Sequence, residues 1–345
     1  MTQAKTWKLL TLLSPPPPDR PCAVMISNPL LKKRVLVDRD VLMDLLADSF
    51  PADSDRSTAA RDRLRELGFL ADSPEDEQLL AEIQHWQRRG WDPALDYYLW
   101  SRSNNYADID PDPEIRRQVI RKYLDEHPVP EELPFPHRQR LAEPGPLPEH
   151  VSLGEVAIGR RTVRRFAEQS LDQRTFSTLL WHGLQSVRKV RQLESQDPLA
   201  YLVSFGVAFD FYLALYDVEG LEAGIYRYSV REHEVGMIVP GDWRETVAHL
   251  LFGQTPPLSA AFTLFIVADF PRYGWRYRHE RALRNLYMDA GRVGHGLILL
   301  AWALQLGTFP TPAVRDRETN QLLQLDENRQ GVIYTLTFGW LPLDR

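Results

Sequence analysis

Residues 159–166 read Gly-Arg-Arg-Thr-Val-Arg-Arg-Phe, a segment that places four arginines and one hydroxyl within six residues. Guanidinium groups bind the oxygens of a doubly charged anion such as a phosphate monoester, and a hydroxyl adds a further hydrogen bond. If the segment is extended, Arg160, Thr162 and Arg164 point to one side and can face one ligand. A solvent-exposed arginine cluster is the alternative interpretation that the charges alone leave open.

The sequence around this segment mixes helical and strand periodicities, which is typical of an α+β domain. Helical spacing covers 175–184 and 281–306, and the second helix is expected to end at Gly307. Apolar runs predict strands at 209–218, 225–228, 235–239, 261–268 and 331–339. We therefore expect one α+β domain over 151–345.

The region before this domain divides into three parts. Residues 1–74 show the strand, helix, helix and strand order of a winged-helix-like domain, whose second helix ends at Gly68. Such a domain binds DNA or adds an extended peptide to a sheet edge. We favour a peptide-binding domain, because acidic residues balance the arginines of that helix. A helical bridge over 75–127 and a proline-rich linker over 128–150 are expected to follow.

The composition is that of an ordinary globular protein, with 43% hydrophobic and 26% charged residues among 345. The net charge of −6 argues against a nucleic-acid partner. Cys22 is the single cysteine, so an internal disulfide and a multi-cysteine metal site are excluded, and we expect no metal. We find no apolar run of membrane-spanning length and no signal peptide, so we expect a cytoplasmic protein without a membrane partner.

The arginine-rich segment with Phe166 resembles the FMN-binding start of the nitroreductase-like flavoproteins. Three later stretches, 218–228, 272–278 and 289–307, resemble in the same order the motifs of the SagB-type branch, which contains azoline dehydrogenases of ribosomal peptide modification. The resemblance implies a nitroreductase-like FMN-binding α+β domain, preceded by the small winged-helix-like domain. It also implies a homodimer with FMN at the interface.

The resemblance assigns cofactor-binding residues. Arg160, Thr162 and Arg164 match the residues that hold the phosphate and ribityl chain of FMN. Ser204 and Gly206 stand for a Pro-Ser-x-Gly-type loop, here without its proline, in which a glycine lets the chain approach the flat ring. Gly307 belongs to the Leu-Gly motif after the long helix and is assigned to the same site.

The catalytic assignment falls on Arg272 and Tyr273, which replace the Lys-Tyr pair of the branch. The role of that pair is to remove a proton from the substrate, which Arg272 cannot do because a guanidinium stays protonated. Tyr273 can act as the base if positive neighbours such as Arg276 and Arg278 favour its phenolate. A surface tyrosine in a basic loop is the alternative.

The function implied is an FMN-dependent dehydrogenase that oxidises azoline rings (thiazoline or oxazoline) to azoles in a ribosomally made peptide. Its partners would be the leader and core of that precursor peptide, with a cyclodehydratase as a further candidate. A nitroreductase-like flavoenzyme acting on a dehydroamino acid, a peptide backbone or a small molecule competes, because the lysine is missing. A non-catalytic peptide-binding subunit and a DNA-binding regulator with a ligand-sensing flavin domain stay open.

Overall fold

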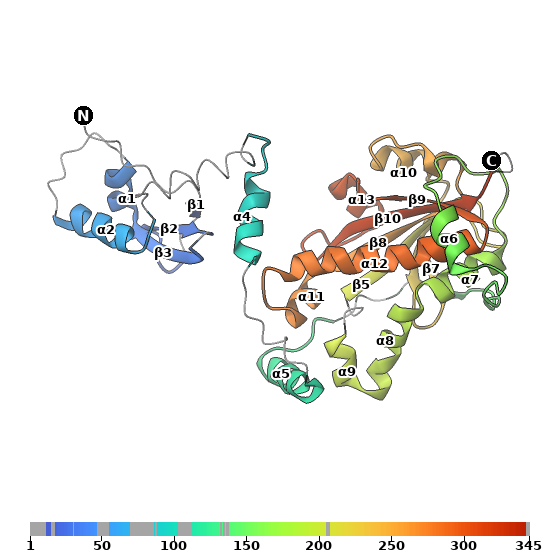
Figure 1. Cartoon of the computed structure of the whole chain (residues 1–345), viewed down its shortest axis with the longest axis horizontal. Helices are drawn as coiled ribbons and strands as arrows, with labels where there is room; N and C mark the ends of the chain where they lie inside the picture. Colours follow the sequence, from blue (N-terminus) through green and yellow to red (C-terminus); the bar gives the residue numbers. More distant parts are fainter. Residues whose placement is uncertain are drawn as a thin grey trace. The chain divides into compact units, whose positions relative to one another are not determined.

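A computed structural model describes residues 12–14, 18–29, 31–46, 55–69, 86, 88–102, 112–131, 133, 135, 138–204 and 208–342 (Figure 1). The chain forms two compact units. Unit 1 comprises residues 1–105 and 279–281, and unit 2 comprises 106–278 and 282–345. No helix in the described ranges is long and apolar enough to cross a membrane.

The described part of unit 1 holds an antiparallel sheet in the order β1-β2-β3. Its strands and helices are β1 (Leu12–Ser14), β2 (Ala23–Asn28), β3 (Lys33–Asp38), α1 (Arg39–Leu46), α2 (Asp55–Glu66) and α4 (Asp92–Ser101). Asp38 begins α1, because its Oδ1 accepts a hydrogen bond of 3.0 Å from the Asp40 N–H. The periodicity did not predict β2, which lies between the other two strands.

Gly68 ends α2 as predicted. Its φ is +81°, and its N–H donates to the Arg65 carbonyl while the Phe69 N–H donates to the Leu64 carbonyl. This pair of hydrogen bonds is the Schellman arrangement, which favours glycine in the left-handed position. Leu64 and Phe69 are buried and pack with Ile26 of the sheet, so the turn also closes the core of unit 1.

Among the described residues of unit 2, seven strands form one sheet in the order β4-β7-β6-β5-β8-β10-β9, with every neighbouring pair antiparallel. They are β4 (Arg138–Arg140), β5 (Phe209–Leu215), β6 (Gly224–Ser229), β7 (Glu234–Pro240), β8 (Phe262–Asp269), β9 (Leu306–Thr311) and β10 (Gln330–Trp340). The five expected strands are present. The two outermost strands, β4 and β9, were not predicted.

Helices cover both faces of this sheet (Figure 1). They are α5 (Pro113–Glu126), α6 (Leu153–Gly159), α7 (Gln173–Gly183), α8 (Gln185–Gln196), α9 (Pro198–Val203), α10 (Arg244–Leu250), α11 (Phe270–Arg276), α12 (Ala282–Ala303) and α13 (Asp316–Leu322). Along β5, Phe211 and Leu213 face the core under α7 and α12, whereas Tyr212 and Ala214 face the core under α10 and α13. The strand is apolar throughout because both of its faces are covered.

The long helix ends earlier than predicted. α12 stops at Ala303, Gln305 takes a φ of +63°, and Leu306 begins β9. Gly307 pairs with Gly339 of β10. The expectation that Gly307 ends the helix is therefore wrong, because the pairing of this segment with β10 overrides its helical spacing.

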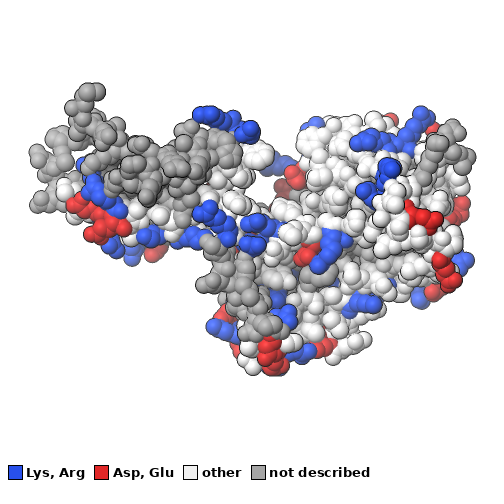
Figure 2. All heavy atoms as spheres, viewed as in Figure 1, with Lys and Arg blue, Asp and Glu red and all other residues white. Residues whose placement is uncertain are grey.

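His127 and the described part of the proline-rich segment belong to unit 2 and are bonded to its other elements through side chains. Trp275 donates to the His127 carbonyl at 3.0 Å, Arg227 donates to the Leu133 carbonyl at 2.9 Å, and the Gly145 N–H donates to Thr178 at 2.7 Å. Acidic and basic side chains lie interspersed on the face of unit 2 that Figure 2 shows.

Candidate functional site

The arginine-rich segment runs along the open edge of the sheet. It follows α6, which begins with a capping box between Ser152 and Glu155 and ends at Gly159. The Val163 N–H donates to the Thr308 carbonyl of β9 at 2.8 Å, and Thr162 forms a parallel bridge with Thr308. The segment is therefore extended beside β9 at Thr162 and Val163, so that neighbouring side chains point to opposite sides.

Thr162 and Arg164 line one pocket of about 470 Å³. Its other walls are residues 253–256, after α10, and residues 309–311 of β9. Val163 points the other way and packs in the apolar core. The structure thus brings two of the three predicted phosphate-binding residues to the same cavity.

The lining fits an anion with a flat organic group. Thr162, Thr255 and Thr311 supply hydroxyls, Gln254 supplies an amide, and Arg164 supplies a guanidinium fork. The volume lies in the range of small-molecule sites. The pocket therefore offers a guanidinium group, hydroxyls and an amide to an anionic ligand.

Arg161 has a structural role, unlike Thr162 and Arg164, which line the pocket. Its guanidinium donates to the carbonyls of Ile158 at 2.6 Å and Arg160 at 2.9 Å. These are carbonyls at the end of α6, so Arg161 stabilises the turn from which the extended segment starts. Its charge is used for structure.

Gly307 contributes through packing. A Cβ built on Gly307 would meet three side-chain atoms of Val163 at 3.0 Å. The absence of a side chain lets the Thr162 segment lie close against β9. Gly159 acts likewise, because a Cβ there would lie 2.9 Å from the Trp302 ring of α12.

Arg160 lies outside the lining of this pocket. It is half-buried, and its charge opposes the burial that raises the pKa of Tyr334. Tyr334 lines a second cavity of about 560 Å³ between α12, α13 and the start of β10. Arg160 is therefore within electrostatic reach of Tyr334 and lies outside the lining of both cavities.

Ser204 follows α9. Its hydroxyl donates to the Ala200 carbonyl at 2.8 Å, and its N–H donates to the Tyr201 carbonyl. The hydroxyl therefore serves the end of the helix in this structure. Gly206, the other residue predicted from this loop, lies outside the described residues.

Tyr273 is buried on α11 with 4% of its surface exposed. Among the described residues its hydroxyl has no hydrogen-bond partner, and its ring lies 4.7 Å from the ring of Tyr277. Burial, followed by Tyr277 and Asp289, raises the pKa of Tyr273, and the opposing charge of Arg276 is the smaller effect. The resting side chain is a neutral phenol.

The arginines around Tyr273 are mostly engaged elsewhere. Arg272 donates to the Tyr201 hydroxyl at 2.8 Å, and Arg278 pairs with Glu126 and lies over the ring of Tyr123. Of the expected neighbours, Arg276 does favour the phenolate, but its effect on the pKa of Tyr273 is smaller than that of burial. Arg278 is engaged elsewhere because the direction of a long side chain depends on elements far away in the sequence.

His233 forms a buried hydrogen-bonded group with Ser177 and Tyr228. Both contacts are 2.7 Å, from Nε2 to the serine and from Nδ1 to the tyrosine. Burial, and then the charge of Arg188, lower the pKa of His233 to about 4. Ser177 is fully buried, so the group joins α7 to the β6–β7 hairpin and is closed to a substrate.

The sequence patterns do not identify residues 253–256 and 309–311 as part of this site. Gly253, with a φ of +77°, and the two prolines at 256 and 257 are turn signals that mark a loop. Nothing in that signal indicates which other segment the loop faces. The described residues contain no group of three or more side chains arranged to hold a metal ion.

Comparisons with known proteins place residues 157–340 in the profile described as the nitroreductase family. The trifolitoxin operon protein TfxC of Rhizobium leguminosarum bv. trifolii is 29% identical over 326 residues, covering 90% of this chain and 89% of that protein. The trifolitoxin-processing protein TfxB of the same organism is 27% identical, covering 87% and 83%. A crystal structure assigned as a nitroreductase from Anabaena variabilis shares the fold, with a TM-score of 0.50 and 23% identity over 70% of this chain and 50% of the other.

Proposed function

This chain belongs to the nitroreductase family, and from that premise we propose that it is an FMN-dependent dehydrogenase oxidising azoline rings to azoles in a ribosomally made peptide. The expected nitroreductase-like α+β fold is confirmed. The family implies an oxidoreductase of the FMN type. The pocket shared by Thr162 and Arg164 is the observation that carries the cofactor assignment.

The azoline substrate is supported by the order of the motifs and by the share of this chain that aligns with its relatives. The SagB-type motifs fall in sequence across unit 2, and TfxC and TfxB align over about nine-tenths of the chain, including unit 1. One relative is named for trifolitoxin processing, which favours the modification of a product over general nitro reduction.

In this proposal Arg164 and Thr162 hold the FMN phosphate, and Arg160, which precedes them on the same segment, adds positive charge nearby. Gln254 and Phe309 face the remainder of the cofactor, and Gly307 keeps the arginine-rich segment against β9. When bound, FMN supplies two-electron chemistry by accepting a hydride from carbon.

We place Tyr273 at the reacting ring. Its hydroxyl is buried and has no hydrogen-bond partner among the described residues, so a substrate could take up that hydrogen bond only by displacing the side chains that cover it. As a neutral phenol it donates a hydrogen bond, and it takes up a substrate proton only after losing its own. If Tyr273 is the base, the oxidation rate should rise with pH through the alkaline range, because burial raises its pKa. Tyr273→Phe should abolish oxidation and retain FMN.

The two groups of candidate residues lie at different ends of α12, with α11 at one end and α6 at the other (Figure 1). Tyr273 is within electrostatic reach of Asp289, whereas Gly159 packs on Trp302. Asp289 and Trp302 are separated by about 20 Å of helix. That separation exceeds the distance between the phosphate and the reactive ring of one FMN. We therefore propose a homodimer in which each flavin receives its phosphate contacts from one protomer and Tyr273 from its partner.

Unit 1 is proposed to hold the leader of the precursor peptide. Within the described sheet β3 is an outer strand, and Lys33 and Arg34 on it are exposed. An outer strand accepts an extended peptide by main-chain hydrogen bonds. Holding the leader raises the local concentration of the core peptide, in the cytoplasm where a cyclodehydratase would supply the azoline.

The first test is flavin binding, with a matched control inside the same segment. We expect FMN to bind the protein and Arg164→Ala to weaken binding about tenfold, because a charge-assisted hydrogen bond is lost. Arg165→Ala removes the same charge one residue further on, outside the pocket lining, and should leave binding close to that of the wild type. Quenching of FMN fluorescence on titration measures both. Equal losses in the two variants would contradict the assigned pocket.

The second test is the reaction. A thiazoline-containing peptide incubated with the FMN-loaded protein should lose two hydrogens, detected by mass spectrometry. A flavin-loaded protein that leaves azolines intact would instead favour a flavoenzyme with another substrate, the candidate that Arg272 in place of lysine supports. A protein that does not bind FMN would favour the non-catalytic peptide-binding subunit.

A further inference from the structure

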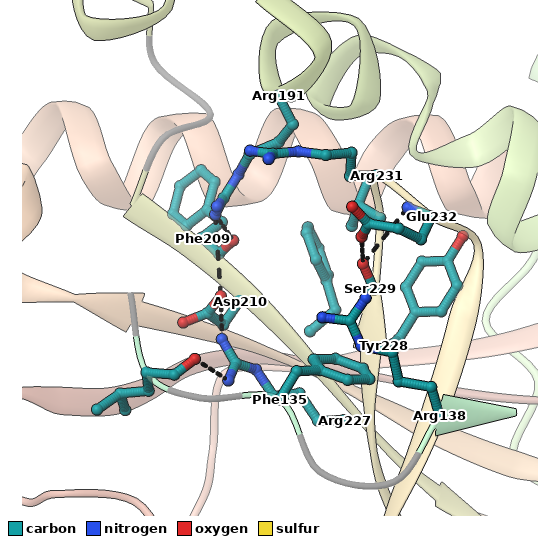
Figure 3. A pocket seen from close by; sticks show the side chains of 13 residues that line it. Phe135, Arg138, Arg191, Phe209, Asp210, Arg227, Tyr228, Ser229, Arg231 and Glu232 are labelled. Carbon is teal, nitrogen blue, oxygen red and sulfur yellow. Dashed lines mark hydrogen bonds and ion pairs between the residues drawn. The ribbon is translucent and has the colours of Figure 1, made fainter. Parts of the chain in front are cut away.

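A further polar pocket of about 270 Å³ lies among β4, β5, β6 and α8. It is on the half of the sheet that ends at β4, whereas the proposed cofactor pocket is at the other edge, beside β9. It shares no lining residue with the pocket of Thr162 and Arg164. Figure 3 shows arginines entering it from separate elements, with Arg191 from α8, Arg227 from β6 and Arg138 from β4. Neither the cofactor nor the proposed proton transfer uses these residues.

The lining carries more positive than negative charge. Arg138, Arg191, Arg227 and Arg231 line the pocket with two carboxylates, Asp210 and Glu232, while Arg138 and Arg231 also pair with Glu234 and Glu194 outside the lining. Asp210 lies 3.2 Å from Arg227 and 3.8 Å from Arg191, and all three side chains are about nine-tenths buried. Arginines brought together at this depth favour an anionic ligand, because a ligand carboxylate would offset part of their mutual repulsion.

The buried arginines are held in place before any ligand arrives. Arg191 donates to the Phe209 carbonyl at 2.7 Å, and Arg227 donates to the Leu133 carbonyl at 2.9 Å. The Phe135 ring lies 5.3 Å from the Arg138 guanidinium and 5.4 Å from that of Arg227. These contacts restrict the guanidinium groups, so little side-chain entropy would be lost on binding.

Arg138 is the adaptable member of the set. Its side chain is 53% exposed, and its ion pair with Glu234 is long, at 3.6 Å. It can therefore turn toward a ligand without breaking a buried contact. Among the pocket arginines it is the one whose replacement tests binding with the least risk to folding.

The size and walls of the pocket select the kind of anion. A volume of about 270 Å³ lies just below the range of drug-sized ligand sites, so it suits a single residue more than a nucleotide. Phe135 and Phe211 add apolar surface beside the guanidinium groups. A carboxylate on a short carbon chain matches both features, whereas inorganic phosphate has no apolar part.

We propose that this pocket binds a peptide carboxylate, the side chain of an acidic residue or the chain terminus of the substrate. The proposal rests on the proposed function for the claim that the substrate is a peptide. The pocket would then hold one carboxylate-bearing position of the peptide while another position of the same peptide reacts.

The test measures binding of small probes to the full-length, FMN-loaded protein by ligand-observed NMR titration. The probes are N-acetylglutamate amide, N-acetylglutamine amide, N-acetylalanine with a free carboxylate, and inorganic phosphate. We expect the glutamate probe to bind about tenfold more tightly than its neutral glutamine analogue. A preference for N-acetylalanine would identify the chain terminus as the source of the carboxylate.

Arg138→Glu should weaken the carboxylate probe at least about tenfold, because it reverses one charge at the pocket. Arg140→Glu is the matched control, since it makes the same change on the same strand outside the lining, and it should leave binding unchanged. FMN content and thermal unfolding of both variants check that the fold is retained.

Several results would overturn the proposal. Equal binding of the glutamate and glutamine probes, absence of carboxylate binding, or an undiminished affinity in Arg138→Glu would each do so. Tighter binding of phosphate with the same dependence on Arg138 would assign the pocket to phosphate. These readouts need no turnover, so a failure of azoline oxidation would be distinguishable from a failure of this site.

Discussion

At the scale of single residues, the proposed cofactor pocket depends on Gly307, which has no side chain. Gly307 leaves room for Val163, and Val163 lies between the two pocket residues Thr162 and Arg164. The chemical groups of the site are therefore positioned by an apolar contact on the far side of the same extended segment.

Gly307→Ala tests this contact. The added methyl would meet Val163 at 3.0 Å, so we expect a loss of about 1–3 kcal/mol in the free energy of unfolding and a weaker affinity for FMN. The loss should be smaller when Gly307→Ala is introduced into Val163→Ala, since two of the three contacted atoms are then missing. Denaturant unfolding and FMN titration of the four proteins measure the coupling. Equal losses in both backgrounds would refute the packing role.

His233 gives a prediction for stability against pH. Its pKa is about 4 in the folded protein and 6.5 ordinarily, so the unfolded chain binds the proton more readily between these values. The free energy of unfolding should therefore fall as the pH falls from 6.5 to about 4, by on the order of 3 kcal/mol from this group.

The measurement is denaturant unfolding of the wild type and His233→Asn at several pH values. Asparagine tolerates the φ of +58° at this position, so backbone strain stays comparable. Other groups titrate in both proteins and cancel in the difference. A difference in stability that does not vary with pH would rule out His233 as the source.

At the scale of elements, turns decide where helices end. α2 ends at a glycine in the left-handed region, and α12 ends before Gln305, which adopts the same region without being a glycine. A glycine after a helical run therefore predicts the end of α2 correctly, whereas Gly307 predicts the end of α12 wrongly. The difference arises because Gly307 is bonded into a strand pair with β10.

Gly68→Ala should weaken the end of α2. An L-residue in the left-handed conformation costs about 1 kcal/mol or more, and its Cβ would lie 3.3 Å from the Leu31 side chain. We expect faster hydrogen exchange in peptides that cover α2. Gly90→Ala makes the same change at a φ of +68° with open space around it, and it should leave α2 unaffected. Unchanged exchange in Gly68→Ala would contradict the role of the Schellman turn.

At the scale of the whole molecule, α12 separates the phosphate-binding residues from Tyr273. In the proposed homodimer a complete site would therefore need two protomers, each supplying one group. This arrangement can be tested without a structure of the dimer.

Heterodimers of Arg164→Ala and Tyr273→Phe, co-expressed with different tags, provide that test. Each heterodimer contains one site with both groups intact and one with both altered, so it should recover about half of the wild-type oxidation rate. The Tyr273→Phe homodimer should be nearly inactive, and the Arg164→Ala homodimer should be nearly inactive at FMN concentrations well below its dissociation constant. Inactive heterodimers would show that both groups act within one chain.

The sequence by itself determined the features that depend on neighbouring residues. The apolar runs at 209–218 and 261–268, the turn at Gly68 and the alternation of Thr162 with Val163 are local patterns, and the structure contains each of them. The motif order also indicated the family, because the spacing of several short motifs survives when most other positions change.

The tertiary structure decided the features that depend on contacts between residues far apart in the sequence. The edge strands β4 and β9 are too short or too irregular to show a period, and they form because a neighbouring strand offers hydrogen bonds. Gln254 reaches the pocket of Thr162 across some ninety residues of sequence. The pKa of Tyr273 and the arginine-lined pocket likewise arise from burial, which is a property of the packed molecule and not of any one segment.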